Sequence, residues 1–190
     1  MKGKLQFVLL VLLASLLLTA CGGAAKPVSG SFVGKVDGSD AFISVVLHTD
    51  GSVTAYVCDS VAISEWFKGN ADDSSLDLTN ASGARLTADL AAGSFNGTFT
   101  PSGANGSSPL TFSVNAADQP AGLYRGEDTV DGVDLVAGWI VLPDGDQRGA
   151  VSGGGKTVSA PAFNTSTRTG KGTTWIDPDP LPWIDPDIQP

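Results

Sequence analysis

Side chains able to act as a catalytic base, a nucleophile or a metal ligand are few in this chain of 190 residues. The chain contains one His, His48, and two Cys, Cys21 and Cys58. This count excludes a zinc site of the usual kind, which needs several His or Cys ligands. His48 precedes an Asp-Gly turn signal, where a His is usually a solvated polar residue, and the chain lacks the Gly-x-Ser-x-Gly sequence of serine hydrolases. The sequence therefore predicts no catalytic residue of the nucleophile-and-base type.

Carboxylates are abundant, because the twenty acidic residues comprise two Glu and eighteen Asp. Glu65 or Glu127, with an Asp as partner, has the chemistry needed to cleave a glycosidic bond. Most of the Asp residues are expected in turns, where the short side chain bonds to the neighbouring backbone. Grouped carboxylates also suit Ca²⁺, although none of the groups has the EF-hand spacing. These groups are Asp128, Asp131 and Asp134; Asp144 and Asp146; and Asp72 and Asp73. We predict no bound metal and no cofactor.

Residues 150–157 match a loose form of the phosphate-binding loop, with Ala150 in place of the first Gly and Lys156-Thr157 at the end. That loop directs backbone N–H groups at phosphates from the start of a helix. Here Thr157 begins a short β-branched segment that Pro161 ends, and such a segment does not form a helix. We therefore expect the glycines of this motif to form a loop between two strands.

The last sixteen residues contain five Pro and four Asp, and they repeat the pentapeptide Trp-Ile-Asp-Pro-Asp at residues 175–179 and 183–187. This composition excludes a helix or a central strand and predicts a disordered tail of polyproline II character. Exposed Trp and Ile side chains in such a peptide can dock in a partner's groove, so we predict a protein-binding role for Trp175, Ile176, Trp183 and Ile184. Two alternatives stay open: a duplication without function, and a tail that folds back onto the domain.

The N-terminus has the layout of an export signal. Lys2 and Lys4 precede an apolar run over residues 5–18 that is too short for a comfortable membrane span. The run ends in Leu18-Thr19-Ala20-Cys21, which resembles the lipobox of bacterial lipoproteins processed by signal peptidase II. The resemblance covers residues 1–21 and implies that Cys21 becomes the first mature residue and carries two or three acyl chains, palmitate among them. That number of chains anchors a small domain stably. A plain signal peptide is the alternative.

Lipidation of Cys21 has consequences for the rest of the chain. Removal of residues 1–20 takes away two Lys and no acid, so the mature chain has 9 basic and 20 acidic residues and a net charge of −11. This acidic balance excludes nucleic acid as a partner. Cys58 has no disulfide partner, and we expect it to be a small buried side chain. The resemblance implies an anchor on the cell membrane or outer membrane, with the domain facing the periplasm or the cell exterior. We expect the chain to be a monomer.

Apolar and polar residues alternate with a period of two from Ser31 onward, which predicts antiparallel strands with one packed and one solvated face. Asp-Gly pairs between the apolar runs predict hairpin turns at residues 37–38, 50–51, 131–132 and 144–145. An aromatic residue also precedes Gly by two positions at Gly34, Gly69, Gly97 and Gly126. Such a Gly either marks the close strand contacts of a curved sheet or arises by chance in a Gly-rich chain.

These patterns predict an all-β domain over residues 31–163. We expect about ten short strands in an antiparallel meander closed into an up-and-down barrel, because nearly all links are short. A two-sheet β-sandwich is the alternative. Residues 1–20 are predicted to be the signal peptide, residues 21–30 a flexible tether, and residues 164–190 a linker followed by the disordered Pro/Asp-rich tail.

The sequence thus favours a lipid-anchored extracytoplasmic binding or interaction module, without catalytic activity and with an unassigned ligand. Its partner would meet the open end of the barrel or the C-terminal tail. A cell-surface hydrolase that uses carboxylates and a structural envelope protein are the alternatives. Two carboxyl groups about 5–9 Å apart in a concave site would favour the hydrolase.

Overall fold

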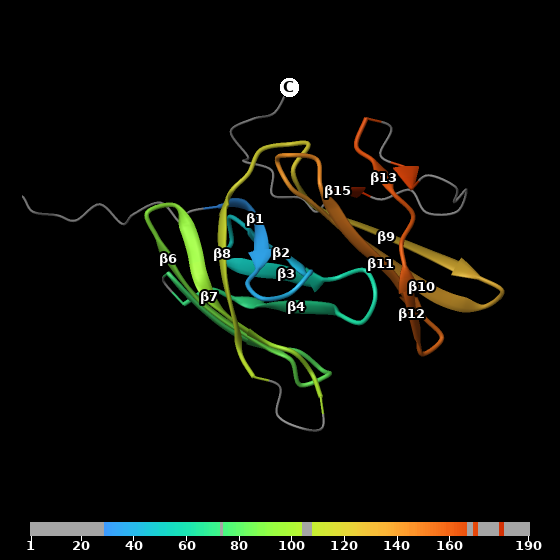
Figure 1. Ribbon diagram of the computed structural model, residues 1–190, viewed down its shortest axis with the longest axis horizontal. Coiled ribbons are helices and arrows are strands. Elements are labelled where there is room, and N and C mark those ends of the chain that lie inside the picture. Colours follow the sequence, from blue (N-terminus) through green and yellow to red (C-terminus); the bar gives the residue numbers. More distant parts are fainter. Residues whose placement is uncertain (1–28, 73, 104–107, 167–168, 171–178, 181–190) are drawn as a thin grey trace, which may run out of the picture.

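The computed structural model describes residues 29–72, 74–103, 108–166, 169–170 and 179–180, which contain strands and turns but no helix (Figure 1). The strands are β1 (Gly30–Val36), β2 (Phe42–Leu47), β3 (Ser52–Cys58), β4 (Ser64–Asn70), β5 (Ser75–Thr79), β6 (Arg85–Ala91), β7 (Ser94–Thr100), β8 (Leu110–Ala116), β9 (Gly122–Val130), β10 (Val133–Val141), β11 (Gln147–Gly153), β12 (Lys156–Ser159), β13 (Phe163–Asn164), β14 (Thr169–Gly170) and β15 (Asp179–Pro180). The prediction of an all-β chain is confirmed.

The first eight strands form one antiparallel sheet that curves into a nearly closed barrel (left in Figure 1). The strand order is β4-β3-β2-β1-β8-β7-β6-β5, so β8 returns to pair with β1. The ladder is interrupted only between β4 and β5, which are consecutive in the chain. The predicted up-and-down meander closed into a barrel is confirmed for this part of the chain.

The Asp-Gly pairs lie where the sequence predicts turns. They connect β1 to β2, β2 to β3, β9 to β10 and β10 to β11. The four Gly residues have φ values between +70° and +89°, which a residue with a Cβ adopts only with strain. In the β9–β10 hairpin Asp131 also has a positive φ, as the tight hairpin turn preferred by the strand twist requires.

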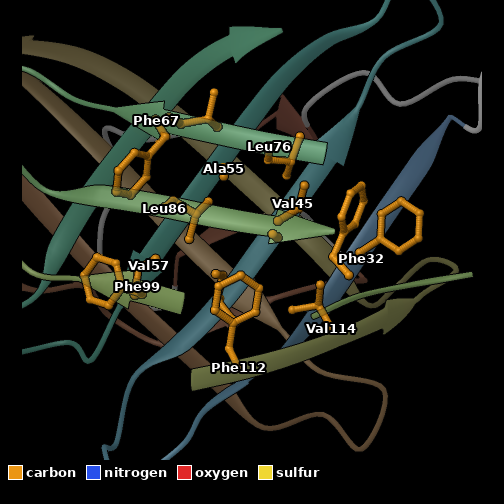
Figure 2. Close-up of a cluster of buried hydrophobic side chains, with 14 of the residues drawn as sticks. Phe32, Val45, Ala55, Val57, Phe67, Leu76, Leu86, Phe99, Phe112 and Val114 are labelled. Atoms are coloured by element: carbon orange, nitrogen blue, oxygen red, sulfur yellow. The ribbon is translucent and has the colours of Figure 1, made fainter. Parts of the chain in front are cut away.

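The barrel interior is filled by apolar side chains (Figure 2). They come from the alternating positions that the sequence places on one face, such as Val45, Ala55, Leu86 and Val114. Five Phe rings complete the interior, and two of its contacts are edge-to-face: Phe32 with Phe95, and Phe67 with Phe99. Full burial of each such side chain contributes about 1.5–3 kcal/mol. The interior of the barrel is therefore a packed apolar core.

Three of the four aromatic-x-Gly motifs mark close contacts between strands of the barrel. A Cβ placed on Gly34 would lie 2.2 Å from the carbonyl oxygen of Ser113 on β8, and one on Gly97 would lie 1.9 Å from that of Thr87 on β6. A Cβ on Gly69 would lie 2.6 Å from Leu78 Cδ2 across the gap between β4 and β5. Of the two interpretations of the motif, the structure supports the curved-sheet one.

A second sheet packs against the outer face of the barrel. It has the order β12-β11-β10-β9-β15 (right in Figure 1). Leu123, Ile140 and Ala150 from this sheet contact the outward side chains of Phe42 and Val46 on the barrel. The expectation that each strand has a solvated face is therefore wrong for β2, whose six residues are all buried. Sequence alternation alone does not predict this second layer.

The segment after β12 covers the far face of the second sheet. Phe163 packs against Tyr124 and Trp139, with ring centroids 4.4 and 5.5 Å away. The indole of Trp139 donates a hydrogen bond to the carbonyl of Pro161, and the side-chain amide of Gln147 makes two hydrogen bonds with the backbone of Phe163.

The chain beyond β13 was predicted to be a disordered linker and tail. Most of that prediction falls outside the described residues. Of the two short pieces that are described, β14 pairs with β13 and β15 pairs antiparallel with β9. Pro180 in β15 accords with the exclusion of Pro from central strands, because β15 is the edge of its sheet.

Candidate binding groove

An open groove lies where the second sheet extends beyond the barrel. β9 and β10 are buried at the ends that contact the barrel and exposed toward their shared hairpin turn. The barrel-facing side of this exposed part and the outer face of β4 enclose about 440 Å³. We call this the Trp66 groove. It is lined by Ser64, Trp66, Lys68, Arg125, Asp134, Val136, Ser152 and Gly153.

The indole of Trp66 is held in place by its neighbours. It stacks on the ring of Tyr56, with centroids 4.1 Å apart and an angle of 24° between the planes. The guanidinium of Arg125 lies 5.6 Å from the centroid of Trp66, within cation–π distance. Gly138 on β10 makes room for the pair, since a Cβ there would lie 2.5 Å from Trp66 and 2.8 Å from Tyr56. Trp66 is therefore a fixed, half-buried wall of the groove.

A ladder of hydroxyl groups crosses the floor of the groove. The hydroxyls of Tyr56 and Ser64 are 3.0 Å apart, those of Ser64 and Ser152 3.4 Å, and those of Ser152 and Thr157 3.0 Å. Burial raises the pKa of Tyr56 well above its usual value of 10.0, so its phenol stays protonated at neutral pH. The ladder joins the barrel to the second sheet and offers Ser64 and Ser152 as donors and acceptors.

Two cations lie in the groove. Arg125 forms an ion pair with Glu127, two residues further along the same face of β9, and this hydrogen-bonded pair lowers the pKa of Glu127. The side chain of Arg125 is only 26% exposed, so it keeps a defined position over Trp66. Lys68 is exposed on β4, where its charge also lowers the pKa of Glu127. At the rim, Asp134 accepts a hydrogen bond of 2.8 Å from the hydroxyl of Thr129.

A second hollow of about 470 Å³ adjoins the groove near the β9–β10 turn and carries acidic groups. Glu127, Asp128 and Asp134 line it, and Asp134 is shared with the Trp66 groove. Glu127 lies opposite Val136 and Asp134 opposite Thr129, so Glu127 and Asp134 are diagonal neighbours on one face of the hairpin. A general acid in a glycosidase needs a raised pKa, whereas the pKa of Glu127 is lowered.

Glu65, the other candidate acid, does not line either of these two hollows. Its carboxylate accepts hydrogen bonds from the side chains of Asn80, Ser82 and Ser102. Asn80 also donates to the carbonyl of Trp66. The bonds from Asn80 and Ser82 link β4 to the segment after β5, where the barrel ladder is interrupted, and the bond from Ser102 links β4 to the segment after β7. Glu65 therefore closes the barrel and is not placed to act on a ligand in the Trp66 groove.

Of the grouped Asp residues, Asp131 and Asp144 lie in turns, Asp128 and Asp134 lie in strands β9 and β10, and Asp72 forms an isolated bridge with Ser75, whereas Asp73 lies outside the described residues. Asp144 accepts a hydrogen bond from the N–H of Asp146, as expected of an Asp in a turn. The carboxylate of Asp128 accepts a hydrogen bond from the N–H of Thr129. Asp134 lies opposite Thr129, and Asp128, one residue before Thr129, is on the other face of β9. Among the residues described, no group of three or more His, Cys, Asp or Glu side chains could hold a metal ion.

The remaining candidates from the sequence are the phosphate-loop motif, His48 and Cys58. The glycines of the phosphate-loop motif form the turn between β11 and β12, with positive φ at Gly154 and Gly155, as expected from the sequence. His48 Nε2 lies 3.3 Å from the hydroxyl of Thr54 beside the predicted turn. Cys58 is buried as expected, and burial raises the pKa of its thiol.

Cys21 and the tail residues Trp175, Ile176, Trp183 and Ile184 lie outside the described residues. Where the structure does describe the chain, it contains no helix with the length and apolarity to span a bilayer.

Sequence reasoning missed the residues that form the groove. No sequence motif identifies Trp66, Lys68 and Arg125, because they belong to two different sheets. The one local signal is the run from Ser64 to Lys68, where every second residue points out of the barrel and two of these outward residues are aromatic or basic. Comparison with known proteins adds no assignment, since no family model, curated protein or solved structure matches this chain.

Proposed function

We propose that the chain is a non-catalytic binding module, anchored to a membrane by lipid on Cys21, that binds an acidic saccharide in the Trp66 groove. The observation that carries the proposal is the combination of a fixed aromatic wall, two cations and the hydroxyl groups of Ser64 and Ser152 in one open groove. Ligand sites typically combine an apolar wall with a few placed polar groups in a volume of about 300–1,000 Å³. The groove, at about 440 Å³, falls in this range.

The charges of the groove favour an anionic ligand group. Lys68 and Arg125 face the same space, in a chain whose net charge is −9. Glu127 fixes Arg125 from the side, which lowers the cost of ordering the guanidinium when a ligand binds. A carboxylate is the natural partner of such a pair of cations.

The other polar groups favour a ligand that also carries hydroxyls. Asp134 at the rim accepts hydrogen bonds, and the hydroxyls of Ser64 and Ser152 both accept and donate. A purely anionic ligand would leave Asp134 unused and close to a like charge. A sugar acid satisfies both kinds of group and can place its C–H surface against Trp66 and Val136.

Glucuronate and glucose form a matched pair of probes, because they share one ring and differ in a carboxylate. We expect glucuronate to bind the chain comprising residues 22–190 with a dissociation constant on the order of 1 mM, and glucose at least tenfold more weakly. The measurement is calorimetric titration at low salt. Lys68→Ala should weaken glucuronate binding, whereas Lys35→Ala, which removes a paired lysine near the opposite end of β10, should not. Equal affinity for the two sugars would contradict the proposal.

The membrane anchor needs its own test. Expression of the full chain in a bacterial host with labelled palmitate should give a labelled protein in the membrane fraction. Cys21→Ala should lose the label and the membrane association. Label that persists in the variant would contradict lipidation at Cys21.

Glycoside hydrolysis is the second candidate, because Glu127 and Asp134 line one hollow. Its test is the release of nitrophenol from a nitrophenyl glucuronide. Turnover that Glu127→Gln abolishes would replace the binding proposal, and the lowered pKa of Glu127 leads us to expect none.

A further inference from the structure

The outer face of the barrel continues from the Trp66 groove onto the neighbouring strand. Ala55 on β3 and Phe67 on β4 point into the barrel core, so the residues that follow or precede them point outward (Figure 2). Two of these outward residues are Thr54 on β3 and Lys68 on β4. They lie opposite each other in the antiparallel register, and Lys68 lines the groove. Thr54 is therefore the direct neighbour of a groove residue.

A third polar side chain follows across the next strand. His48 comes directly after β2, and its Nε2 lies 3.3 Å from the hydroxyl of Thr54. Lys68 is exposed, and Thr54 and His48 are partly exposed. We call these three residues the Thr54 strip. Neighbouring strands lie about 4.8 Å apart, so the strip from β4 to β2 adds about 10 Å of polar surface to the groove.

The strands under the Thr54 strip carry no acidic residue on their outward positions. These positions are Ser52, Thr54, Tyr56 and Cys58 on β3, and Ser64, Trp66, Lys68 and Asn70 on β4. Asp50, in the turn between β2 and β3, accepts a hydrogen bond from the N–H of Ser52. The whole chain has 20 acidic and 11 basic residues, so an outer face with Lys68 and no strand carboxylate suits an anionic ligand better than the chain average does.

We propose that the Thr54 strip is a second subsite, and that the ligand is an acidic oligosaccharide of two or more rings. This inference rests on the proposed function, because it extends the same site. The first ring lies against Trp66, with its carboxylate at Arg125 and Lys68. The next ring lies along the strip and forms hydrogen bonds with Thr54 and His48. A hydroxyl has one donor and two acceptor positions, so Thr54 can bond to a sugar as well as to His48.

Glucuronate and its glycosidically linked dimer, diglucuronate, test the second subsite because they differ only in the second ring. In calorimetric titrations of the full chain at low salt, we expect the dimer to bind on the order of tenfold more tightly than the monomer. Thr54→Val and His48→Gln, made separately, should each reduce this ratio to about twofold, the gain that two equivalent rings give by statistics alone.

Thr87→Val is the matched control. Thr87 lies on β6, and its hydroxyl is 2.9 Å from that of Thr98 on β7, so the substitution also breaks one hydroxyl contact between barrel strands. Neither residue lines the groove or belongs to the Thr54 strip. Thr87→Val should therefore keep the wild-type ratio of the two affinities.

Three results would overturn the inference. If glucuronate binds and the dimer gains about twofold or less in the wild type, the strip takes no second ring while the proposed function stands. If Thr54→Val and His48→Gln both keep the wild-type ratio, the second ring lies elsewhere. If neither sugar binds, the proposed function fails and the second subsite fails with it.

Discussion

Gly138 on β10 sets the shape of the Trp66 groove, and alanine at this position is the most informative perturbation. A Cβ there would lie 2.5 Å from Trp66 Cζ2 and 2.8 Å from Tyr56 Cε1, whereas ordinary contacts begin at 3.4 Å. The Trp66 ring must therefore move by about 0.9 Å, the difference between 3.4 and 2.5 Å. Tyr56 is fully buried, so Trp66, which is half-buried, moves outward and the stack of the two rings opens.

The expected cost follows from packing. Overpacking of a close contact costs about 1–3 kcal/mol, and a lost aromatic pair costs about 0.5–1.5 kcal/mol. Replacing Gly by Ala within a strand returns about 0.5–1 kcal/mol through lower backbone entropy in the unfolded chain. We expect Gly138→Ala to lower the free energy of unfolding by about 0.5–4 kcal/mol on balance.

Urea unfolding followed by far-UV circular dichroism measures this loss, and near-UV circular dichroism reports the stack. In the background of Trp66→Leu the contact with the indole is removed and the contacts with Tyr56 at 2.8 and 2.9 Å remain, so the same substitution should cost less than in the wild type without becoming neutral. Gly138→Ala with wild-type stability and an unchanged near-UV spectrum would refute the packing of Trp66 and Tyr56 against β10.

Three further predictions concern the framework around the groove. Burial raises the pKa of Tyr56, so its contribution to the free energy of unfolding is fully present below about pH 10 and falls above it by up to about 1.4 kcal/mol per pH unit. Tyr56→Phe should reduce this slope in urea unfolding at alkaline pH. An unchanged slope in the variant would argue against its burial. Glu65→Ala should lower the free energy of unfolding by about 2–4 kcal/mol, because three donors lose their acceptor. Glu127→Ala removes an exposed carboxylate and should leave the unfolding midpoint unchanged. Equal effects of the two substitutions would contradict the closing role of Glu65. Gln147→Ala should speed cleavage by chymotrypsin at Phe163, and wild-type cleavage kinetics would show that the two amide hydrogen bonds do not hold the segment.

Much of the barrel could be predicted because its signals are local. The alternation in residues 84–90 places Leu86 and Ala88 on one face, and both are buried in the barrel. The Asp-Gly pairs define hairpins because the turn itself requires residues that tolerate a positive φ. Short links then leave an antiparallel meander as the simplest topology. Each inference needs only neighbours in the sequence.

The second sheet and the groove depend on contacts between distant segments. Phe42 and Val46 point out of the barrel, and their apolar character in the run Phe42–Leu47 is the local trace of a covering layer. A strand with apolar residues on both faces also fits a β-sandwich, so the run does not identify the covering element. Trp66 and Arg125 meet only once the two sheets have packed.

The two Glu residues also show that the role of a side chain depends on contacts between distant segments. Glu65 and Glu127 look equivalent as candidate acids in the sequence, yet Glu65 closes the barrel and Glu127 orients Arg125. Their roles follow from partners that are 15 and 2 residues away in the chain, and the longer separation cannot be inferred from spacing.

Assignment of the amides that respond to glucuronate tests the central claim most directly, namely that the Trp66 groove is the binding site. In heteronuclear NMR spectra of the chain comprising residues 22–190, glucuronate should shift the amides of Lys68, Ser152 and Gly153 and the indole N–H of Trp66. Glucose at the same concentration should leave them in place. Shifts confined to the loops at the barrel ends, or equal shifts with both sugars, would contradict the account.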